Sequence, residues 1–198
     1  MSAVTPDILR LDAAATEALL PQLVALLRDA VESGASLGFW RPLADDDALA
    51  YWREVAAEVS SRARELLVAQ RAGTLLGSVQ LALPSKQNAV QRAEVQKLMV
   101  LRAARRQGIG QALMRAVERL ALEEGRTTLV LDTQTGSDAE RLYSALGYVR
   151  VGAIPAYVVD ADGMASPTTI FYKSLDMATD GGARSEAGAA ERQERSAR

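Results

Sequence analysis

A basic, glycine-containing segment of the chain has the composition of a phosphate-binding turn. The stretch VLRAARRQGIGQALMRAV, residues 100–117, passes from an apolar segment through three arginines and two glycines into a helical repeat. The first turn of a helix carries backbone N–H groups without intrahelical partners and a partial positive charge. We therefore expect this segment to bind a phosphate group where the helix begins.

The spacing of the glycines excludes two common phosphate-binding motifs. The dinucleotide-binding fingerprint needs a third glycine, and Leu113 follows Gly108 and Gly110 at that place. The Walker loop ends in Gly-Lys-Ser or Gly-Lys-Thr, and the chain contains neither triplet. The ligand must therefore be a phosphate compound that a different motif recognises.

The composition limits which side chains can do chemistry. The chain has 198 residues, no cysteine and no histidine. It therefore lacks a cysteine nucleophile, thiolate metal ligands and the usual general base. Carboxylates, hydroxyls, lysine and backbone groups remain, and we expect no bound metal. The net charge of -2 argues against broad nucleic-acid binding.

The chain is expected to form one domain over residues 1–176. No apolar run approaches the roughly 20 residues needed to span a bilayer, and the N-terminus lacks a signal-peptide pattern. A cytoplasmic protein that binds no membrane is the resulting expectation. Residues 177–198 are predicted to be a disordered tail, because the segment is polar, rich in glycine and alanine, and lacks an apolar stripe.

The hydrophobic pattern alternates between strand and helix periods, which predicts an α/β (α+β) fold. About seven strands are expected, at residues 7–12, 64–70, 74–83, 92–101, 127–133, 149–159 and 168–175. About four helices are expected, at residues 18–33 and 45–61, from Ile109 to about Gly125, and over a segment that ends at Gly147.

The strand predicted over 92–101 places a carboxylate beside apolar residues. Alternation puts one set of side chains on one face: Ala93, Val95 and Met99. The opposite face then carries Glu94, Gln96, Leu98 and Val100.

Two segments in this order resemble the GNAT superfamily of N-acetyltransferases. Arg105-Arg-Gln-Gly108-Ile-Gly110 resembles its motif Arg/Gln-x-x-Gly-x-Gly/Ala, whose backbone amides take the pyrophosphate of acetyl-CoA. AERLYSALGYVRVG, residues 139–152, resembles a later helix and strand of the superfamily. GASLGF, LDTQTGSDAERLYSALGY and ADGMASPTTIFYKSL further resemble its tabtoxin-resistance branch, so the likeness covers residues 34–175.

The resemblance implies an acyl-CoA N-acyltransferase fold, with a mixed central sheet, and acetyl-CoA as co-substrate. The residues it implies for acetyl-CoA are Leu98, Met99, Val100, Arg105, Arg106, Gln107, Gly108, Ile109, Gly110 and Gln111. Many members have an asparagine seven residues before the tyrosine of the later motif, and Gly136 stands there instead. The contact of that asparagine is therefore not carried over.

Acetyl transfer to an amine needs a base, because an amine with a lysine-like pKa is only about one part in a thousand unprotonated at pH 7. Glu94 and Asp132 are the candidate bases, and the choice between them stays open. A free N–H near Leu98 to Val100 could stabilise the oxyanion if the strand splays from its neighbour. Tyr143 could protonate the departing thiolate. The tabtoxin-resistance resemblance implies the same roles.

Each candidate also has a structural interpretation. Glu94 could pair with Lys97 or Arg92, Asp132 could cap a loop, and Tyr143 could be a core residue. Phe39 and Trp40 are candidates for substrate contact or for partial burial in the core.

The predicted function is direct acetyl transfer from acetyl-CoA to a primary amine of a small molecule, such as an amino-acid-like toxin or antibiotic. The alternative is a non-catalytic acyl-CoA sensor or scaffold of the same fold. Nucleic-acid binding through the arginine cluster is a third class, which we do not expect. The protein is expected to be a monomer or homodimer.

Overall fold

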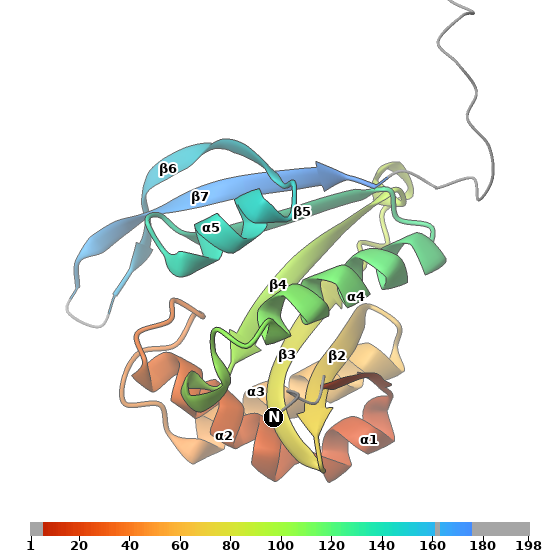
Figure 1. Ribbon diagram of the computed structural model, residues 1–198, viewed down its shortest axis with the longest axis vertical. Helices are drawn as coiled ribbons and strands as arrows, with labels where there is room; N and C mark the ends of the chain where they lie inside the picture. Colours follow the sequence, from red (N-terminus) through yellow and green to blue (C-terminus); the bar gives the residue numbers. More distant parts are fainter. Residues whose placement is uncertain (1–5, 161–162, 176–198) are drawn as a thin grey trace, which may run out of the picture.

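One seven-stranded sheet runs through the structure in the order β1-β2-β3-β4-β5-β7-β6 (Figure 1). The structure is a computed structural model and describes residues 6–160 and 163–175. The strands are β1 (Asp7–Leu11), β2 (Arg64–Arg71), β3 (Thr74–Ala82), β4 (Arg92–Val100), β5 (Thr128–Gln134), β6 (Val149–Val159) and β7 (Ala165–Ser174). Only β4 and β5 pair in parallel, so the sheet is mixed, as the family resemblance implies.

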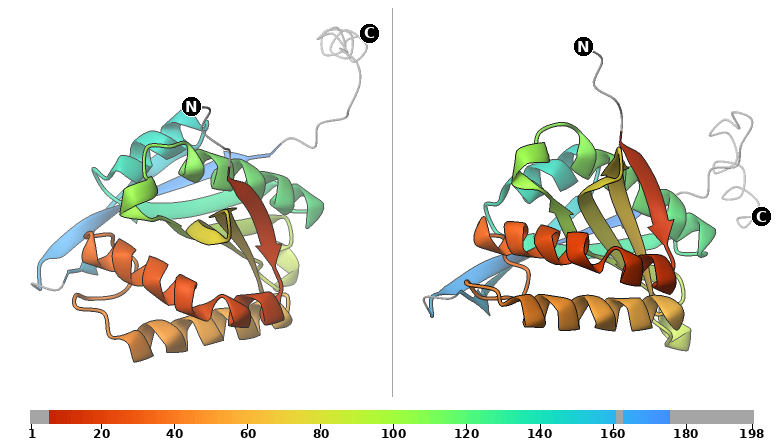
Figure 2. Two further views of the ribbon diagram at one scale, coloured as in Figure 1. Left: turned by 60° about the horizontal axis from the view of Figure 1, so that its bottom comes forward. Right: turned by 90° about the horizontal axis from the view of Figure 1, so that it is seen from below.

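Five α-helices of the described chain cover the two faces of the sheet (Figure 2). One face carries α1 (Ala13–Ala18), α2 (Leu20–Glu32) and α3 (Asp45–Ser60). The other face carries α4 (Ile109–Glu123) and α5 (Asp138–Ala145). Two short 3₁₀ turns, η1 (Gln87–Ala89) and η2 (Arg102–Ala104), flank β4.

The helix predicted over 18–33 corresponds to α2, and α1 is a further helix immediately before it that the sequence analysis did not predict. Asp12 caps α1, since its Oδ1 accepts a hydrogen bond of 2.7 Å from the Ala15 N–H. Pro21 lies in the first turn of α2, where its missing N–H costs no hydrogen bond. This extra helix explains the difference from the expected number.

Each face of the sheet buries its own hydrophobic core. Beneath α4 and α5, the largest buried side chains include Leu113, Met114, Leu129 and Phe171. Beneath α1, α2 and α3, the largest include Trp52, Leu23, Leu26 and Leu66. The sheet therefore separates two apolar layers, and any path between its faces must pass between strands.

A β-bulge at Lys97 changes which side chains of β4 share a face. Lys97 has a left-handed backbone with φ 51, and the register of β3 with β4 shifts there. Leu98 and Val100 consequently pack against the same core as Val95, whereas Met99 lies in the opposite core. The predicted strict alternation is therefore wrong beyond the bulge, since one extra residue inverts the pattern.

The sheet opens between β4 and β5. Their parallel pairing is limited to Arg92–Glu94 on β4 and Thr128–Val130 on β5. Beyond these residues the two strands diverge (Figure 1). A bulge bends its strand and increases its twist, which accounts for the turn of β4 away from β5. The sequence analysis required β4 to splay from its neighbour if an N–H group near Leu98 to Val100 is to be free. The divergence of β4 from β5 meets this requirement.

The tail predicted over 177–198 lies outside the described residues. Within the described ranges, none of the helices is both long and apolar enough to cross a lipid bilayer.

Candidate active site

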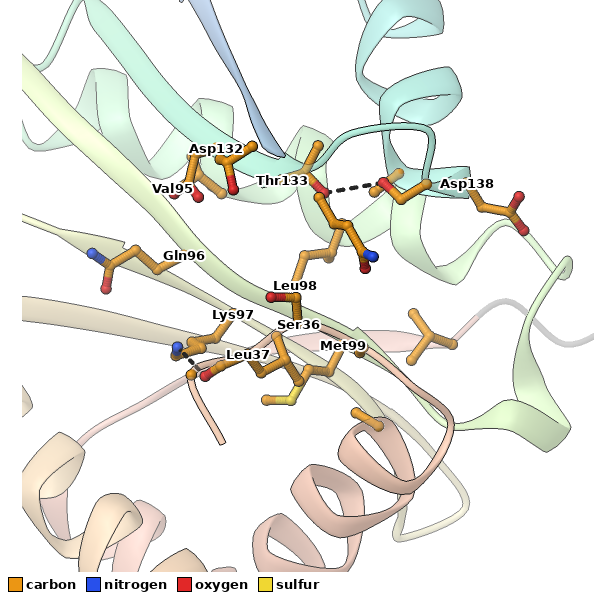
Figure 3. Close-up of a pocket in the computed structure, with 18 of the residues that line it drawn as sticks. Ser36, Leu37, Val95, Gln96, Lys97, Leu98, Met99, Asp132, Thr133 and Asp138 are labelled. Atoms are coloured by element: carbon orange, nitrogen blue, oxygen red, sulfur yellow. Dashed lines mark hydrogen bonds between the residues drawn. The ribbon is translucent and has the colours of Figure 1, made fainter. Parts of the chain in front are cut away.

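A cavity of about 560 Å³ occupies the opening between β4 and β5 (Figure 3). β4 lines it from Glu94 to Val100, and Asp132 of β5 and Tyr143 of α5 complete its walls. The loop that follows α2, residues 34–38, forms the wall of the cavity nearest α1, α2 and α3. The divergence of the two strands therefore brings the three predicted catalytic residues around one space.

Glu94 and Asp132 share a face of the sheet at the cavity. Glu94 pairs with Val130, and Asp132 follows on the same side of β5. The Glu94 Oε1 accepts a hydrogen bond of 2.8 Å from the Gln96 Nε2. Burial, and then the negative charge of Glu94, raise the pKa of Asp132, while Lys97 opposes that rise. The two carboxylates therefore interact electrostatically.

Tyr143 reaches the cavity from the opposite face of the sheet. It is only 6% exposed and belongs to the core beneath α4 and α5. Its ring centre lies 5.8 Å from that of Tyr148 and 5.9 Å from that of Phe171. Burial, and then the charge of Asp132, raise the pKa of Tyr143. The phenol therefore keeps its proton at neutral pH, and it is a core residue and a cavity residue at once.

The predicted phosphate turn lies immediately before α4. Gly108 has φ 79 and occupies the N-cap position, where, within the described chain, no side chain accepts a hydrogen bond from the helix. A Cβ added to Gly108 would meet no described atom within 4 Å, so the space beside this turn is open. The unpartnered N–H groups of the first turn are thus accessible to an anion.

Arg105 joins this turn to the cavity, which it lines. Its Nε donates to the Val100 carbonyl at 3.1 Å, and its Nη2 donates to the Ser33 Oγ at 2.7 Å. An arginine side chain has five N–H donors, so further donors remain for a phosphate oxygen. The motif arginine therefore stands between the end of β4 and the end of α2.

The other residues implied for acetyl-CoA fall into three groups. Leu98, Met99 and Val100 line the cavity. Arg106, Gln107 and Gln111 are exposed around the turn, and Gly110 is partly buried within the first helical turn. The Ile109 side chain is buried in the core, so only its backbone is available.

Phe39 and Trp40 line a second cavity of about 480 Å³ and not the first. The two cavities share the wall formed by residues Gly34, Ala35, Ser36, Gly38, Gln134 and Val158. Phe39 is partly buried and packs edge-on against Tyr51 at 5.3 Å. Trp40 is 66% exposed, and its Nε1 donates to the Val159 carbonyl at 3.2 Å. The structure therefore places both residues beside the carboxylate cavity.

Lys97 and Gln96 are cavity residues that the sequence analysis did not select. The Lys97 Nζ donates to the Leu37 carbonyl at 2.6 Å and lies about 6 Å from the rings of Phe39 and Tyr51. Burial, and then the charge of Arg64, lower its pKa. The position of Gln96 two residues after Glu94 was a usable signal, whereas the bulge that redirects Lys97 has no such signal.

Among residues 6–160 and 163–175, no cluster of three or more acidic side chains is placed to hold a metal ion.

Comparison with known proteins identifies the family. The model of the acetyltransferase (GNAT) family matches residues 25–148, so the chain belongs to that family. This confirms the superfamily resemblance and the acetyltransferase class.

Solved structures share the fold at low sequence identity. Ribosomal-protein-alanine N-acetyltransferase from Brucella melitensis has a TM-score of 0.71 at 23% identity, covering 85% of this chain and 99% of that one. The Salmonella typhimurium protein yncA, solved with its cofactor acetyl-CoA, has a TM-score of 0.67 at 21% identity, with coverages of 92% and 98%. A provisionally assigned phosphinothricin N-acetyltransferase has a TM-score of 0.67 at 19% identity, with coverages of 86% and 99%. These likenesses support the fold and do not select a substrate.

Proposed function

We propose that the protein transfers an acetyl group from acetyl-CoA to a primary amine of a small molecule. The observation that carries this proposal is the cavity between β4 and β5, which joins two carboxylates, a buried phenol and the basic turn before α4. Membership of the acetyltransferase family supports the reaction type. The acceptor and the roles of individual residues are proposed from the site itself.

The turn before α4 fits the pyrophosphate of acetyl-CoA. Its open backbone at Gly108 and the uncapped first turn offer N–H donors, and Arg105 adds a positive charge. Bound acetyl-CoA would supply the activated thioester. The cavity residues Leu98, Met99 and Val100 then form the wall along which the acyl end of the ligand would lie.

Glu94 and Asp132 act as the proton acceptors. The acceptor amine is mostly protonated at neutral pH and must lose a proton before its nitrogen can attack the acyl carbon. The raised pKa of Asp132 brings that carboxylate closer to the working pH. Glu94 carries the negative charge that helps to hold the ammonium group, and the proton that this group loses before the attack passes to the carboxylate pair. The second proton, which the nitrogen loses once the carbon–nitrogen bond has formed, balances the departing thiolate, so that CoA leaves as the thiol.

The backbone of β4 and the Tyr143 hydroxyl stabilise the negative charge that develops on the acyl oxygen and then on the sulfur. The backbone of β4 beyond Glu94 does not pair with β5, so an N–H group near Leu98 to Val100 can donate to the acyl oxygen. Tyr143 donates a hydrogen bond to the sulfur as the carbon–sulfur bond breaks. An ordinary thiol is more acidic than a buried phenol, so stabilisation by this hydrogen bond is the main contribution of Tyr143.

The acceptor is proposed to be a small amine that enters through the second cavity. Phe39 and Trp40 would contact the part of the acceptor that lies away from its amine. The resemblance to the tabtoxin-resistance branch makes amino-acid-like toxins the first compounds to test.

Release of free CoA thiol across a panel of amines tests this function. The protein is incubated with acetyl-CoA and each amine, the thiol is measured with a thiol reagent, and the acetylated product is identified by mass. Amine-dependent thiol release with matching product supports the proposal. Tight binding of acetyl-CoA by calorimetry without thiol release for any amine would instead support a non-catalytic sensor.

A further inference from the structure

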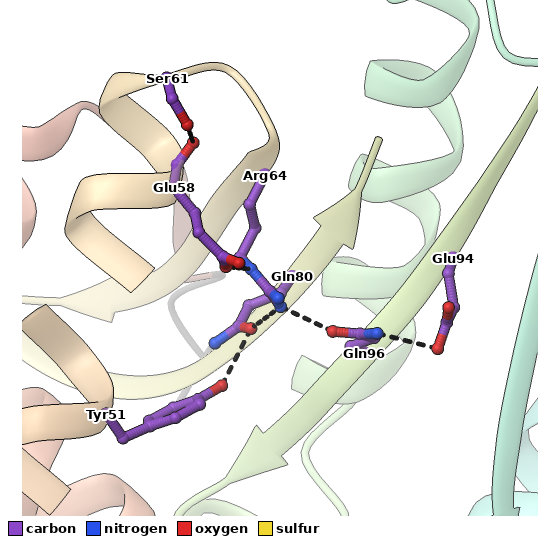
Figure 4. A network of polar contacts seen from close by, with 7 residues as sticks. All are labelled: Tyr51, Glu58, Ser61, Arg64, Gln80, Glu94 and Gln96. Atoms are coloured by element: carbon purple, nitrogen blue, oxygen red, sulfur yellow. Dashed lines mark hydrogen bonds and ion pairs between the residues drawn. The ribbon is translucent and has the colours of Figure 1, made fainter. Parts of the chain in front are cut away.

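A polar network connects Glu94 to residues that lie outside the cavity (Figure 4). Arg64, the first residue of β2, is at its centre, and its side chain is 15% exposed. Its Nη1 donates to the Gln80 Oε1 and to the Gln96 Oε1, each at 2.6 Å. Gln96 in turn donates to Glu94 at 2.8 Å. One cation therefore stands two hydrogen bonds from a proposed catalytic carboxylate.

Arg64 determines which way the Gln96 amide points. The amide oxygen accepts from the guanidinium, so the amide nitrogen faces the Glu94 carboxylate. The reversed amide would set N–H groups against a cation and an oxygen against an anion, and would lose both hydrogen bonds. Gln96 is consequently held as a donor to Glu94.

Two residues of α3 hold Arg64 in place, one directly and one through Gln80. Its Nε pairs with Glu58 of α3, and Tyr51 of the same helix donates to the Gln80 Oε1 at 3.0 Å. Gln80 on β3 is fully buried, so its carbonyl can receive both donors only from fixed positions. Burial raises the pKa of Tyr51 to about 12, which keeps its hydroxyl proton available. The guanidinium is thus anchored between α3 and the sheet.

The network leaves one carboxylate oxygen of Glu94 for the acceptor. Oε1 takes the hydrogen bond from Gln96, and Oε2 takes none in the described chain. The charged groups that act on Glu94 from neighbouring positions are Asp132 on β5 and Lys97 at the bulge. A carboxylate with a like charge on one side needs an independent donor to keep its orientation.

We propose that Arg64 and Gln96 are positioning residues that orient the Glu94 carboxylate for proton acceptance. This inference rests on the proposed function. The competing interpretation is that the network only fastens α3 to the sheet. The two interpretations differ in whether the effect of Arg64 on turnover requires the carboxylate of Glu94.

A double-mutant cycle with Glu94→Gln separates these interpretations. Arg64→Met and Gln96→Leu are each made in the wild-type and Glu94→Gln backgrounds, and kcat and both KM values are measured. We expect each single variant to lower kcat by roughly 10-fold or more with KM for acetyl-CoA unchanged. In the Glu94→Gln background the same changes should alter kcat by less than about 2-fold, because the carboxylate that Arg64 and Gln96 orient is already absent.

Two additional variants control for stability. Arg64→Lys retains the positive charge but has a single donor nitrogen in place of three, so it should recover only part of the kcat lost in Arg64→Met. Arg10→Met removes an ion pair with the buried Glu65 on the far side of the sheet. It should lower the melting temperature and leave kcat unchanged. If Arg64→Met does not fold, Gln96→Leu carries the test, since Gln96 makes only two side-chain hydrogen bonds in the described structure.

The possible failures have distinct signatures. Wild-type kcat in folded Arg64→Met and Gln96→Leu, together with an impaired Glu94→Gln, overturns the positioning role alone. The positioning role is also overturned if Arg64→Met and Gln96→Leu lower kcat by the same factor in the Glu94→Gln background as in the wild type. Wild-type turnover in Glu94→Gln itself removes Glu94 as a base, which is a failure of the proposed function.

Discussion

Asp132 lies two residues beyond Val130, the partner of Glu94, so the two carboxylates project from the same face of adjacent parallel strands. The negative charge of Glu94 contributes to the raised pKa of Asp132. Repulsion between like charges makes Asp132 hold a proton more tightly than a free aspartate does. The pair is therefore suited to receive a proton from a cationic amine.

The first prediction concerns the pH dependence of turnover. Glu94→Gln and Asp132→Asn should each reduce kcat/KM by roughly 10²-fold where the amine is mostly protonated. The deficit should shrink as the pH rises toward the pKa of the amine, since less proton removal is then needed. The measurement is a pH-rate profile for each variant.

Asp138→Asn provides a matched control for this experiment, because Asp138 also lines the cavity but pairs with Arg141 on α5. Its profile should follow that of the wild type. A deficit in Glu94→Gln and Asp132→Asn that does not change with pH would recast both carboxylates as groups that only position the amine.

The second prediction concerns stability. An aspartate whose pKa is raised on folding binds its proton more tightly in the folded state than in the unfolded chain. The contribution of this proton to folding stability is complete below the ordinary aspartate pKa of 3.8. It is lost as the pH rises through the raised pKa of the folded state. Asp132→Asn should therefore melt at a higher temperature than the wild type at pH 7, and the advantage should narrow toward pH 4. Calorimetric melting temperatures that differ equally at both pH values would contradict this.

The third prediction concerns Tyr143. Tyr143→Phe keeps the ring against Tyr148 and Phe171 and removes only the hydroxyl. Turnover should fall by roughly 10²-fold, while the melting temperature and the affinity for acetyl-CoA change little. Steady-state kinetics and calorimetry provide the test. A Tyr143→Phe enzyme with wild-type turnover would remove Tyr143 from the reaction.

The fourth prediction concerns the turn before α4. Gly108→Val places a branched side chain in the open space beside the first helical turn and should abolish measurable acetyl-CoA binding. Backbone strain is controlled by Gly125→Val at the other end of α4, where φ is 71 and the added Cβ also meets no described atom within 4 Å. Calorimetry on both folded variants compares them. Equal acetyl-CoA affinities in the two would show that the turn does not hold the pyrophosphate.

The fifth prediction concerns the second cavity. Trp40→Ala should raise KM for the amine several-fold, by roughly the effect of one lost apolar contact, and leave KM for acetyl-CoA unchanged. Tyr157→Ala is the control, since Tyr157 is exposed on β6 but lines neither cavity. Identical kinetic constants in the two variants would place the acceptor elsewhere.

Local sequence signals predicted the elements and the turn well. The helical period after Gly108 and the β-branched run before Asp132 depend on neighbouring residues only, so their elements appear within a residue or two of the expected positions. Glu94, Asp132 and Tyr143 could be selected because chemistry and motif agreed on them.

Features that depend on distant residues could not be predicted from the sequence. The bulge at Lys97 is compatible with an ordinary strand pattern, so alternation assigned Met99 and Leu98 to the wrong faces. Arg64 lies 32 residues from Gln96, and only the antiparallel order of β2, β3 and β4 brings them together. No local signal links such a pair.

The bulge at Lys97 also means that the cavity depends on the number of residues in β4 as well as on their types. Removing one residue at this point would restore a regular ladder with β3 and leave Leu98 on the face of Val95 and Met99 on the opposite face. A straighter β4 could then continue its pairing with β5 past Glu94 and seal the opening, with Asp132 and Tyr143 still present in the sequence. For this chain, we expect a single-codon deletion at the bulge to close the reaction centre while every proposed catalytic side chain is retained.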